Sequence, residues 1–140
     1  MNHLQMLQQI NTLAAFNRWC GLEVVHAEAG SATLQLDWRD ELGQYSGFLH
    51  AGLVATLIDT ACGFAAATMA GPHLLAAHFS VNCLRPATGS RFTARARVTK
   101  PGKSQVFTAC DLYAQGENGD ILVANGQTLL TVVPAPTTRR

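Results

Sequence analysis

The longest apolar stretch of the chain begins with His50-Ala-Gly-Leu-Val-Ala-Thr-Leu-Ile-Asp59-Thr-Ala-Cys-Gly63 and continues to Ala70. Apolar side chains occupy nearly all sides of a helix built from this stretch, and a helix of that kind is buried rather than laid on a surface. Gly71-Pro72 follows and is a helix-ending pair. The sequence therefore predicts one long central helix over residues 51–70.

Strand-like runs flank this helix on both sides. Before it, two short runs form a pair joined at Gly30, and after it come four longer runs separated by glycine- and proline-containing turns. In the second run after the helix, Arg91, Thr93, Arg95 and Arg97 alternate with apolar residues and are expected to point outward. The order predicts an α+β domain, an antiparallel sheet wrapped around one buried helix. The expected strands are 23–29, 32–37, 74–84, 91–99, 105–114 and 121–133.

The chain has 140 residues, which is enough for one domain, because two half-sized domains would each bury too little surface. We expect a single domain over 1–140, with a short N-terminal helix at about 2–17 and a loose tail at about 134–140. Charged residues make up 14% of the chain, against about 25% in ordinary soluble domains. So few charges predict that much of the surface is covered, and self-association is the simplest way to cover it.

The formal net charge is +1, which excludes a global field that would recruit nucleic acid. The charge is unevenly distributed, because residues 85–103 hold six basic side chains and no acidic one. This patch suits a small anionic ligand, since arginine pairs well with phosphate. Arg91, Arg95 and Arg97 are its best candidates, and a solvated strand face is the alternative interpretation.

Four scattered cysteines and five histidines lack the spacing of a metal site, so neither a metal nor a separate cofactor is expected. Cysteines of this kind predict a reduced, cytoplasmic protein with buried thiols. The first twenty residues do not have the pattern of a secretory signal. Asp59 interrupts the apolar stretch, and we therefore expect no membrane span.

One polar stripe runs along the predicted central helix. Thr56, Asp59, Thr60 and Gly63 stand at i, i+3, i+4 and i+7 and therefore share a face. A buried carboxylate is costly unless it is paired or faces a cavity, and the helix contains no arginine or lysine. Asp59 is therefore either a nucleophile or general base that lines a cleft with the rest of the stripe, or a packing residue held by hydrogen bonds.

The segment Gln44-Tyr-Ser-Gly-Phe-Leu-His50-Ala-Gly52 leads into the start of the helix. Unpaired N–H groups at a helix N-terminus carry a partial positive charge and can polarise a carbonyl oxygen as an oxyanion hole does. The small residues Ala51 and Gly52 would let a substrate approach the backbone. His50 either caps the helix and braces the loop or transfers a proton.

The stretch 50–63 resembles the H-G-G-x-x-x-T-L-x-D-x-A-x-G signature of hotdog-fold acyl-CoA thioesterases, most closely the phenylacetate-pathway (PaaI-like) branch. Ser80-Val-Asn-Cys-Leu-Arg-Pro-Ala87 resembles that family's second block, a strand ending in L-R-P-A. The element order matches over about residues 20–133. The resemblance implies a hotdog fold and hydrolysis of acyl-CoA, with coenzyme A as part of the substrate. It also implies a homodimer as the minimal unit, usually paired into a homotetramer.

The same resemblance implies roles for individual residues. Asp59, nine positions after the histidine, does the chemistry, the N–H of Ala51 polarises the thioester carbonyl, and Gln44 places the thioester or the water. Nine residues of helix rise about 13 Å, so Asp59 cannot serve the N-terminus of its own helix. A two-fold dimer would hold two composite sites, each combining Asp59 of one chain with the helix start of the other.

Three residues depart from the family pattern. Ala51 replaces a glycine, Ala76 stands where the family often has a hydroxyl near the attacking water, and His78 stands where it often has Asp. Either Thr60 supplies this hydroxyl, or the site has no hydroxyl near the attacking water. The leading alternative function is a non-catalytic acyl-CoA-binding protein such as a metabolite sensor. A hydratase or dehydratase on the same fold ranks third.

Overall fold

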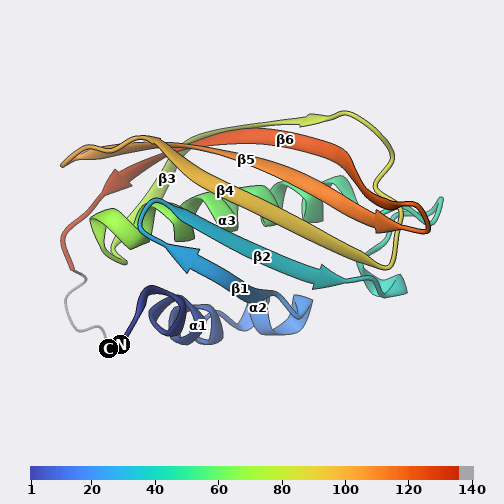
Figure 1. The fold of residues 1–140 in the computed structure, drawn as a ribbon, viewed down its shortest axis with the longest axis horizontal. Coiled ribbons are helices and arrows are strands. Elements are labelled where there is room, and N and C mark those ends of the chain that lie inside the picture. Colours follow the sequence, from blue (N-terminus) through green and yellow to red (C-terminus); the bar gives the residue numbers. More distant parts are fainter. Residues whose placement is uncertain (136–140) are drawn as a thin grey trace.

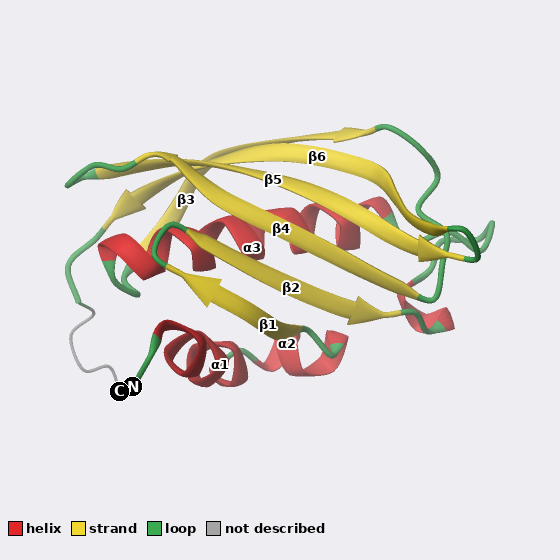
Figure 2. Cartoon of the chain, in the orientation of Figure 1, coloured by secondary structure: helices red, strands yellow, loops and turns green. Residues whose placement is uncertain are grey.

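The computed structural model describes residues 1–135, and they fold around one long helix (Figure 1). Six strands form a single antiparallel sheet in the order β1-β2-β4-β5-β6-β3. The sheet curves over α3, while α1 and α2 lie below β1 (Figure 2). The elements are α1 (His3–Leu13), α2 (Ala15–Cys20), β1 (Glu23–Glu28), β2 (Ser31–Asp37), a 3₁₀ turn (Asp40–Leu42), α3 (Ala51–Ala70), β3 (Leu74–Cys83), β4 (Arg91–Lys100), β5 (Gln105–Gly116) and β6 (Gly119–Val132).

Helix α3 confirms the central prediction, because it spans the predicted residues and is capped at both ends. The side chain of His50 accepts a hydrogen bond from the N–H of Gly52, and Gly71 donates its N–H to the carbonyl of Ala67. An antiparallel sheet wrapped around this one helix is the arrangement that the sequence predicted. Strand bounds also agree with the prediction to within two residues.

The apolar character of α3 is explained by its burial. Its mean hydropathy of 1.6 and its 20 residues would suit a membrane span, but 56% of that window is buried within this fold. The side chains that face the sheet include Leu57, Ile58 and Ala61, all with no exposed area. A helix enclosed on this scale needs apolar residues on most of its circumference.

The N-terminal region differs from the single helix predicted at about 2–17. Ala14 adopts an extended conformation (ψ 117°) and separates α1 from α2. The buried amide of Asn11 holds this break, because it donates to the carbonyl of Leu22 at 2.7 Å and so turns the chain toward β1. The chain turns after Cys20, where Gly21 adopts the left-handed conformation (φ 81°).

Two side-chain placements differ from the sequence-based expectations. Thr93 lies on the outer face of the sheet but is only 8% exposed, because its neighbours Gln35 and Tyr113 on the adjoining strands cover it. Cys83 is exposed, although the thiols were expected to be buried, because β3 is the last strand of the sheet. Of the predicted loose tail, residues 134 and 135 lie outside any strand, and residues 136–140 lie outside the described residues.

Glycine at one position of β6 lets α3 approach the sheet closely. A Cβ placed on Gly126 would lie 2.4 Å from the carbonyl oxygen of Ser80 and 2.9 Å from Cγ2 of Ile58. Both distances are shorter than real Cβ atoms show. The missing side chain therefore sets the depth of α3 next to Asp59, the residue that follows Ile58.

We predict that Gly126→Ala destabilises the fold by about 1–3 kcal/mol, because the added methyl overpacks the contact between sheet and helix. Gly116→Ala is the matched control, since its Cβ would meet nothing closer than 3.9 Å. Urea unfolding followed by far-UV circular dichroism measures both. Equal shifts of the midpoint in the two variants would show that this contact is not tight.

Candidate functional site

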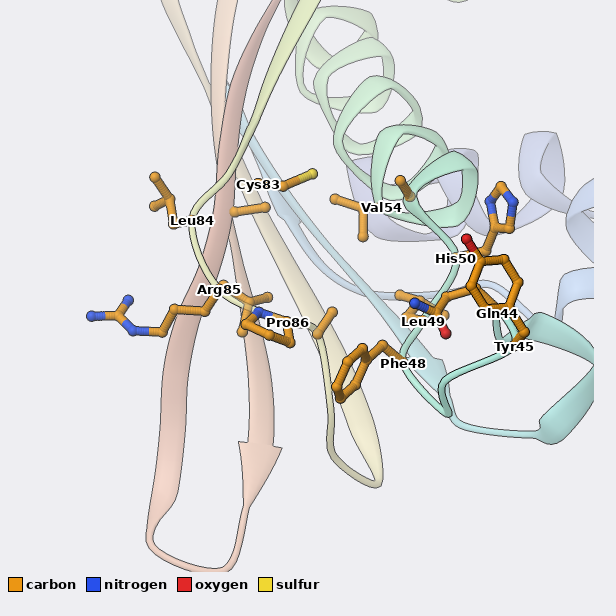
Figure 3. A pocket seen from close by; sticks show the side chains of 14 residues that line it. Gln44, Tyr45, Phe48, Leu49, His50, Val54, Cys83, Leu84, Arg85 and Pro86 are labelled. Carbon is orange, nitrogen blue, oxygen red and sulfur yellow. The ribbon is translucent and has the colours of Figure 1, made fainter.

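The first candidate site is a cavity of about 490 Å³ at the N-terminus of α3 (Figure 3). One wall comes from the loop that leads into the helix, and the opposite wall comes from the segment that follows β3. The first wall ends where the 50–63 block of the family resemblance begins, and the second wall belongs to the 80–87 block. The lining residues used below are Gln44, Phe48, His50, Ala51, Arg85 and Pro86.

Backbone hydrogen bonds hold the two walls together. Within the loop, Gln44 donates its N–H to the carbonyl of Phe48 at 2.8 Å, and His50 donates to Leu42 at 3.0 Å. Across the cavity, Leu49 donates to the carbonyl of Ala87 at 2.9 Å. The start of α3 is therefore fixed in place by the backbone rather than by side chains.

His50 acts as the N-cap of α3. Its Nδ1 accepts a hydrogen bond from the N–H of Gly52 at 2.8 Å, which occupies that ring nitrogen. A Cβ on Gly52 would lie 3.0 Å from the same atom, so a glycine is favoured at this position. The sequence allowed His50 to be either a helix cap or a proton-transfer group, and the geometry agrees with the helix cap.

The N–H of Ala51 is available to a ligand. It is the first residue of α3, is exposed, and within residues 1–135 its N–H has no acceptor. Orphan N–H groups of this kind bind anions and polarised oxygens. The predicted oxyanion-binding group is therefore exposed in a cavity.

Gln44 lies beside this helix start and is partly fixed by its own turn. Its side-chain carbonyl oxygen accepts from the N–H of Ser46, which leaves the amide nitrogen to donate elsewhere. Gln44 and Ala51 both line the cavity, so the structure brings these two predicted residues together.

The second candidate site is a separate cavity of about 210 Å³ farther along α3. The polar stripe contributes Asp59, Thr60 and Gly63, and the remaining lining is almost entirely apolar. That apolar lining comes from four other parts of the fold and from the next turns of α3. Its residues are Ile10, Phe64, Ala67, Pro72, Leu74, Ala76 and Leu130.

Asp59 holds an ionisable carboxyl in this mostly apolar setting. Its Oδ1 is buried and has no hydrogen-bond partner in the described chain. Burial raises the pKa of Asp59 above its usual value, and the nearby Thr128 hydroxyl offsets part of that rise. Thr128 Oγ1 also has no hydrogen-bond partner in the described chain, so this hydroxyl and the carboxyl oxygen are both left unsatisfied. An unpartnered buried carboxylate is unfavourable for stability, which is expected of a group kept for chemistry.

The structure separates the predicted residues into two groups. Gln44, His50 and Ala51 line the first cavity, Asp59 and Thr60 line the second, and the two cavities share no lining residue. Two other predicted contacts line neither cavity. Gly52 is turned toward His50, and the hydroxyl of Thr56 donates to the carbonyl of Gly52 at 2.9 Å.

The three arginines proposed for an anionic ligand lie on the outer face of the sheet, away from both cavities. Each is paired with a carboxylate: Arg91 with Asp37 at 2.8 Å, Arg97 with Asp111 at 3.5 Å, and Arg95 with Asp120 at 4.0 Å. Acidic residues on β2, β5 and β6 supply these partners, which the local sequence around the arginines did not indicate. The solvated-strand-face interpretation describes this arrangement.

Several cavity residues escaped the sequence analysis. Ile10 comes from the N-terminal helix and Leu130 from the last strand, so only the folded chain places them beside Asp59. Arg85, which the sequence analysis included in the basic patch 85–103, does line the first cavity and donates to the carbonyl of Leu122 at 2.6 Å. Among residues 1–135 there is no cluster of three or more potential metal ligands.

The family model of the thioesterase superfamily matches residues 46–120, which is more than half of the chain. The chain belongs to the thioesterase superfamily. This is a family of thioesterase- and esterase-type hydrolases, and the matched region contains the start of α3, Asp59 and the L-R-P-A block. It does not include α1 or most of β6.

Comparisons with single proteins agree with the family. A thioesterase family protein from Silicibacter pomeroyi has 29% identity and a TM-score of 0.90, covering 95% of this chain and 100% of that one. A thioesterase of Haemophilus influenzae has 21% identity and a TM-score of 0.80, covering 93% and 90%, and supports the fold alone. A candidate esterase of Saccharolobus solfataricus is 24% identical over 84% of this chain and 86% of the relative. The hotdog fold is thus confirmed.

We predict that Asp59→Asn raises the stability of the protein at neutral pH. The pKa of Asp59 is raised in the folded state. Between the ordinary aspartate pKa of about 4 and this raised pKa, the folded chain therefore binds more protons than the unfolded chain. The free energy of unfolding of wild type falls as pH rises through this range. Below about pH 4 both forms carry a neutral side chain, and the advantage of the variant disappears.

Urea midpoints of wild type and Asp59→Asn, measured from pH 3.5 to pH 8 (a range that brackets the ordinary aspartate pKa of about 4), check this prediction. Asp120→Asn is the control, because its carboxylate forms only a surface pair with Arg95, and such pairs contribute little. A gain in Asp59→Asn that is largest at acid pH would contradict the stated cause.

Proposed function

We propose that this chain is an acyl-CoA thioesterase of the PaaI-like branch, acting in the cytoplasm, with Asp59 as its catalytic carboxylate. The observation that carries the proposal is the unpartnered, half-buried carboxyl of Asp59 at an apolar cavity. The exposed N–H of Ala51 supplies the complementary group for the carbonyl oxygen. Membership of the thioesterase superfamily gives the reaction class in which these two groups act.

In the proposed reaction, the thioester carbonyl oxygen accepts a hydrogen bond from Ala51 N–H, which stabilises negative charge as it develops on that oxygen. Asp59 then acts in one of two ways. As a general base it removes a proton from water, whose oxygen attacks the carbonyl carbon; the C–S bond then breaks, and the departing coenzyme A thiolate takes up that proton. As a nucleophile its own oxygen attacks, coenzyme A leaves as a thiolate, and water cleaves the resulting mixed anhydride. Either route consumes one water and releases a carboxylic acid and the thiol.

A second copy of the chain is part of the proposal, because Asp59 and Ala51 lie in different cavities. The edge strand β3 supports this. Its ten residues, LLAAHFSVNC, include no lysine, glutamate, aspartate or proline, and most are exposed on both faces. Unprotected edges of this length invite pairing with another strand. Leu75 and Phe79, 64% and 45% exposed, add apolar area there.

Two-fold symmetry would turn this edge into a composite site. The start of β3 borders the cavity of Asp59 through Leu74 and Ala76, and its end borders the cavity of Ala51 through Cys83. Two copies of β3 paired about a two-fold axis run antiparallel, so the start of one strand lies beside the end of the other. Asp59 of one copy would then face Ala51 and Gln44 of its partner.

The remaining parts of the proposal concern coenzyme A and further assembly. Arg85 lines the cavity of Ala51 and is placed to meet an anionic group there. Arg91, Arg95 and Arg97 reach coenzyme A phosphates only if they leave their present carboxylate partners. A dimer of such dimers, with no nucleic acid or membrane partner, is the assembly that the family resemblance implies.

One observation favours a second candidate function, a non-catalytic acyl-CoA-binding protein. Ala76, which stands where the family resemblance implies a hydroxyl near the attacking water, lines the Asp59 cavity. Thr60 lines the same cavity and offers a hydroxyl in its place. Free-thiol release from a panel of acyl-CoAs separates the two functions, because the binding protein would bind the panel without releasing thiol.

We predict that Asp59→Asn and Ala51→Pro each lower kcat/KM by about 10² or more. Proline at the first helical position removes the N–H without breaking the helix, and His50 has the extended conformation (φ −58°, ψ 138°) that a following proline requires. Thiol release measures the loss, and circular dichroism checks that both variants stay folded. Full activity in Ala51→Pro would exclude the oxyanion role of that N–H.

Mixing the two variants tests the composite site. A mixed dimer contains one site in which Asp59 and Ala51 are both intact and one site in which both are lost. About half of the dimers in a co-refolded equal mixture are mixed, so the mixture should recover about a quarter of wild-type activity. Each variant refolded alone is the control and stays inactive. If both groups served a site within one chain, the mixture would recover nothing.

For His50 we predict that His50→Asn keeps kcat within about tenfold of wild type, because asparagine also caps helices well. His50→Ala should lower stability by about 1 kcal/mol through loss of the cap. Rates and urea midpoints of both variants test this. A loss of 10² or more in His50→Asn, in the range of general acid–base catalysis, would assign a proton-transfer role instead.

A further inference from the structure

The cavity next to Asp59 contains a feature that packing does not explain. Gly63 lies within helix α3, one turn after Asp59, where glycine lowers helix stability relative to alanine. Its φ is not in the left-handed region, so its conformation does not require glycine. A Cβ placed there would meet only Cδ2 of Leu130, at the ordinary contact distance of 3.9 Å.

The absence of a side chain at Gly63 therefore leaves open space in the cavity and is not required by close packing. Gly63 lines the cavity together with Asp59 and Thr60 of the polar stripe and with two later residues of α3, Phe64 and Ala67. These lining residues run from position 59 to position 67 of α3, a rise of about 12 Å along the helix. These residues line a channel that starts at the carboxyl of Asp59 and continues along an apolar surface.

Ile10 forms part of the wall of this channel from outside the family's matched region. Helix α1 is anchored by Leu7, which is completely buried. Ile10 stands one turn later on the same side of α1, is half-buried, and lines the channel. The N-terminal helix therefore helps to enclose the cavity in which Asp59 lies.

We propose that this channel receives the acyl group of the substrate and that Gly63 and Ile10 are its specificity-determining residues. The inference rests on the proposed function, since it assigns the acyl group to the Asp59 side of the thioester. The volume of about 210 Å³ exceeds a cavity of about 150 Å³ that holds benzene. The channel therefore suits a compact acyl group, of about ring size with one or two further carbons, and not a long fatty acyl chain.

Kinetics with acetyl-, hexanoyl-, phenylacetyl- and palmitoyl-CoA test the assignment in Gly63→Ala and Ile10→Ala. Gly63→Ala should lower kcat/KM for hexanoyl- and phenylacetyl-CoA by about tenfold or more, the effect of one misplaced methyl group in an apolar pocket. Its loss with acetyl-CoA should be much smaller. Its urea midpoint should equal or exceed that of wild type, so the selective loss cannot come from unfolding.

Ile10→Ala should shift the preference the other way, raising the ratio of palmitoyl- to hexanoyl-CoA turnover by about tenfold. Met6→Ala is the matched control. Met6 is also half-buried on α1 and packs against the same core, but it does not line the cavity. An unchanged ratio in Met6→Ala and a raised ratio in Ile10→Ala support the inference.

Binding of S-alkyl-coenzyme A thioethers of graded length, measured by titration calorimetry, keeps the test independent of hydrolysis. Gly63→Ala should weaken binding of the six-carbon thioether selectively, and Ile10→Ala should strengthen binding of longer ones. If wild type hydrolyses no acyl-CoA, the proposed function fails, and these binding profiles still decide the inference. Equal effects on all chain lengths, or identical profiles for Ile10→Ala and Met6→Ala, would overturn it.

Discussion

Enclosure of helix α3 by the curved sheet is the constraint on which the other features depend. The helix is 20 residues long, and ten of them are buried, mostly against strands β2 to β6. Close approach depends on positions such as Gly126, where any side chain would collide with Ser80 and Ile58. Because the contact is this tight, the rotation of α3 about its axis is fixed. The face that carries Asp59, Thr60 and Gly63 is thereby held toward a cavity rather than toward the core.

The same enclosure raises the pKa of Asp59 and makes its carboxylate unfavourable for stability. A carboxylate on an exposed helix would be hydrated and would have an ordinary pKa. On α3 its Oδ1 is cut off from partners, and burial raises its pKa. The fold thus tolerates a group that lowers its stability, which is common where chemistry is carried out.

The prediction from sequence succeeded where a pattern is local and failed where partners come from distant elements. The bounds of α3 followed from an uninterrupted apolar run and a Gly71-Pro72 stop, and strand alternation placed Arg91, Arg95 and Arg97 on the outer face. Their carboxylate partners could not be foreseen, because pairing depends on the register between strands. The break at Ala14 depends on a bond from Asn11 to Leu22, a tertiary contact with no local signal. Within the candidate site, grouping by spacing put Thr56 beside Asp59, but its hydroxyl is used by the helix itself.

The division of the site between parts of the chain is informative in its own right. The groups proposed for the chemistry, Ala51 and Asp59, both lie within the residues matched by the family model, as does Gly63. Two walls of the Asp59 cavity, Ile10 and Leu130, lie outside that region. A helix with a fixed rotation can keep its reacting groups in place while elements added before and after it change the shape of the cavity. In such a fold the reaction would be specified by α3 and its capping loop, whereas the size of the acyl group would be specified largely by α1 and the end of the sheet.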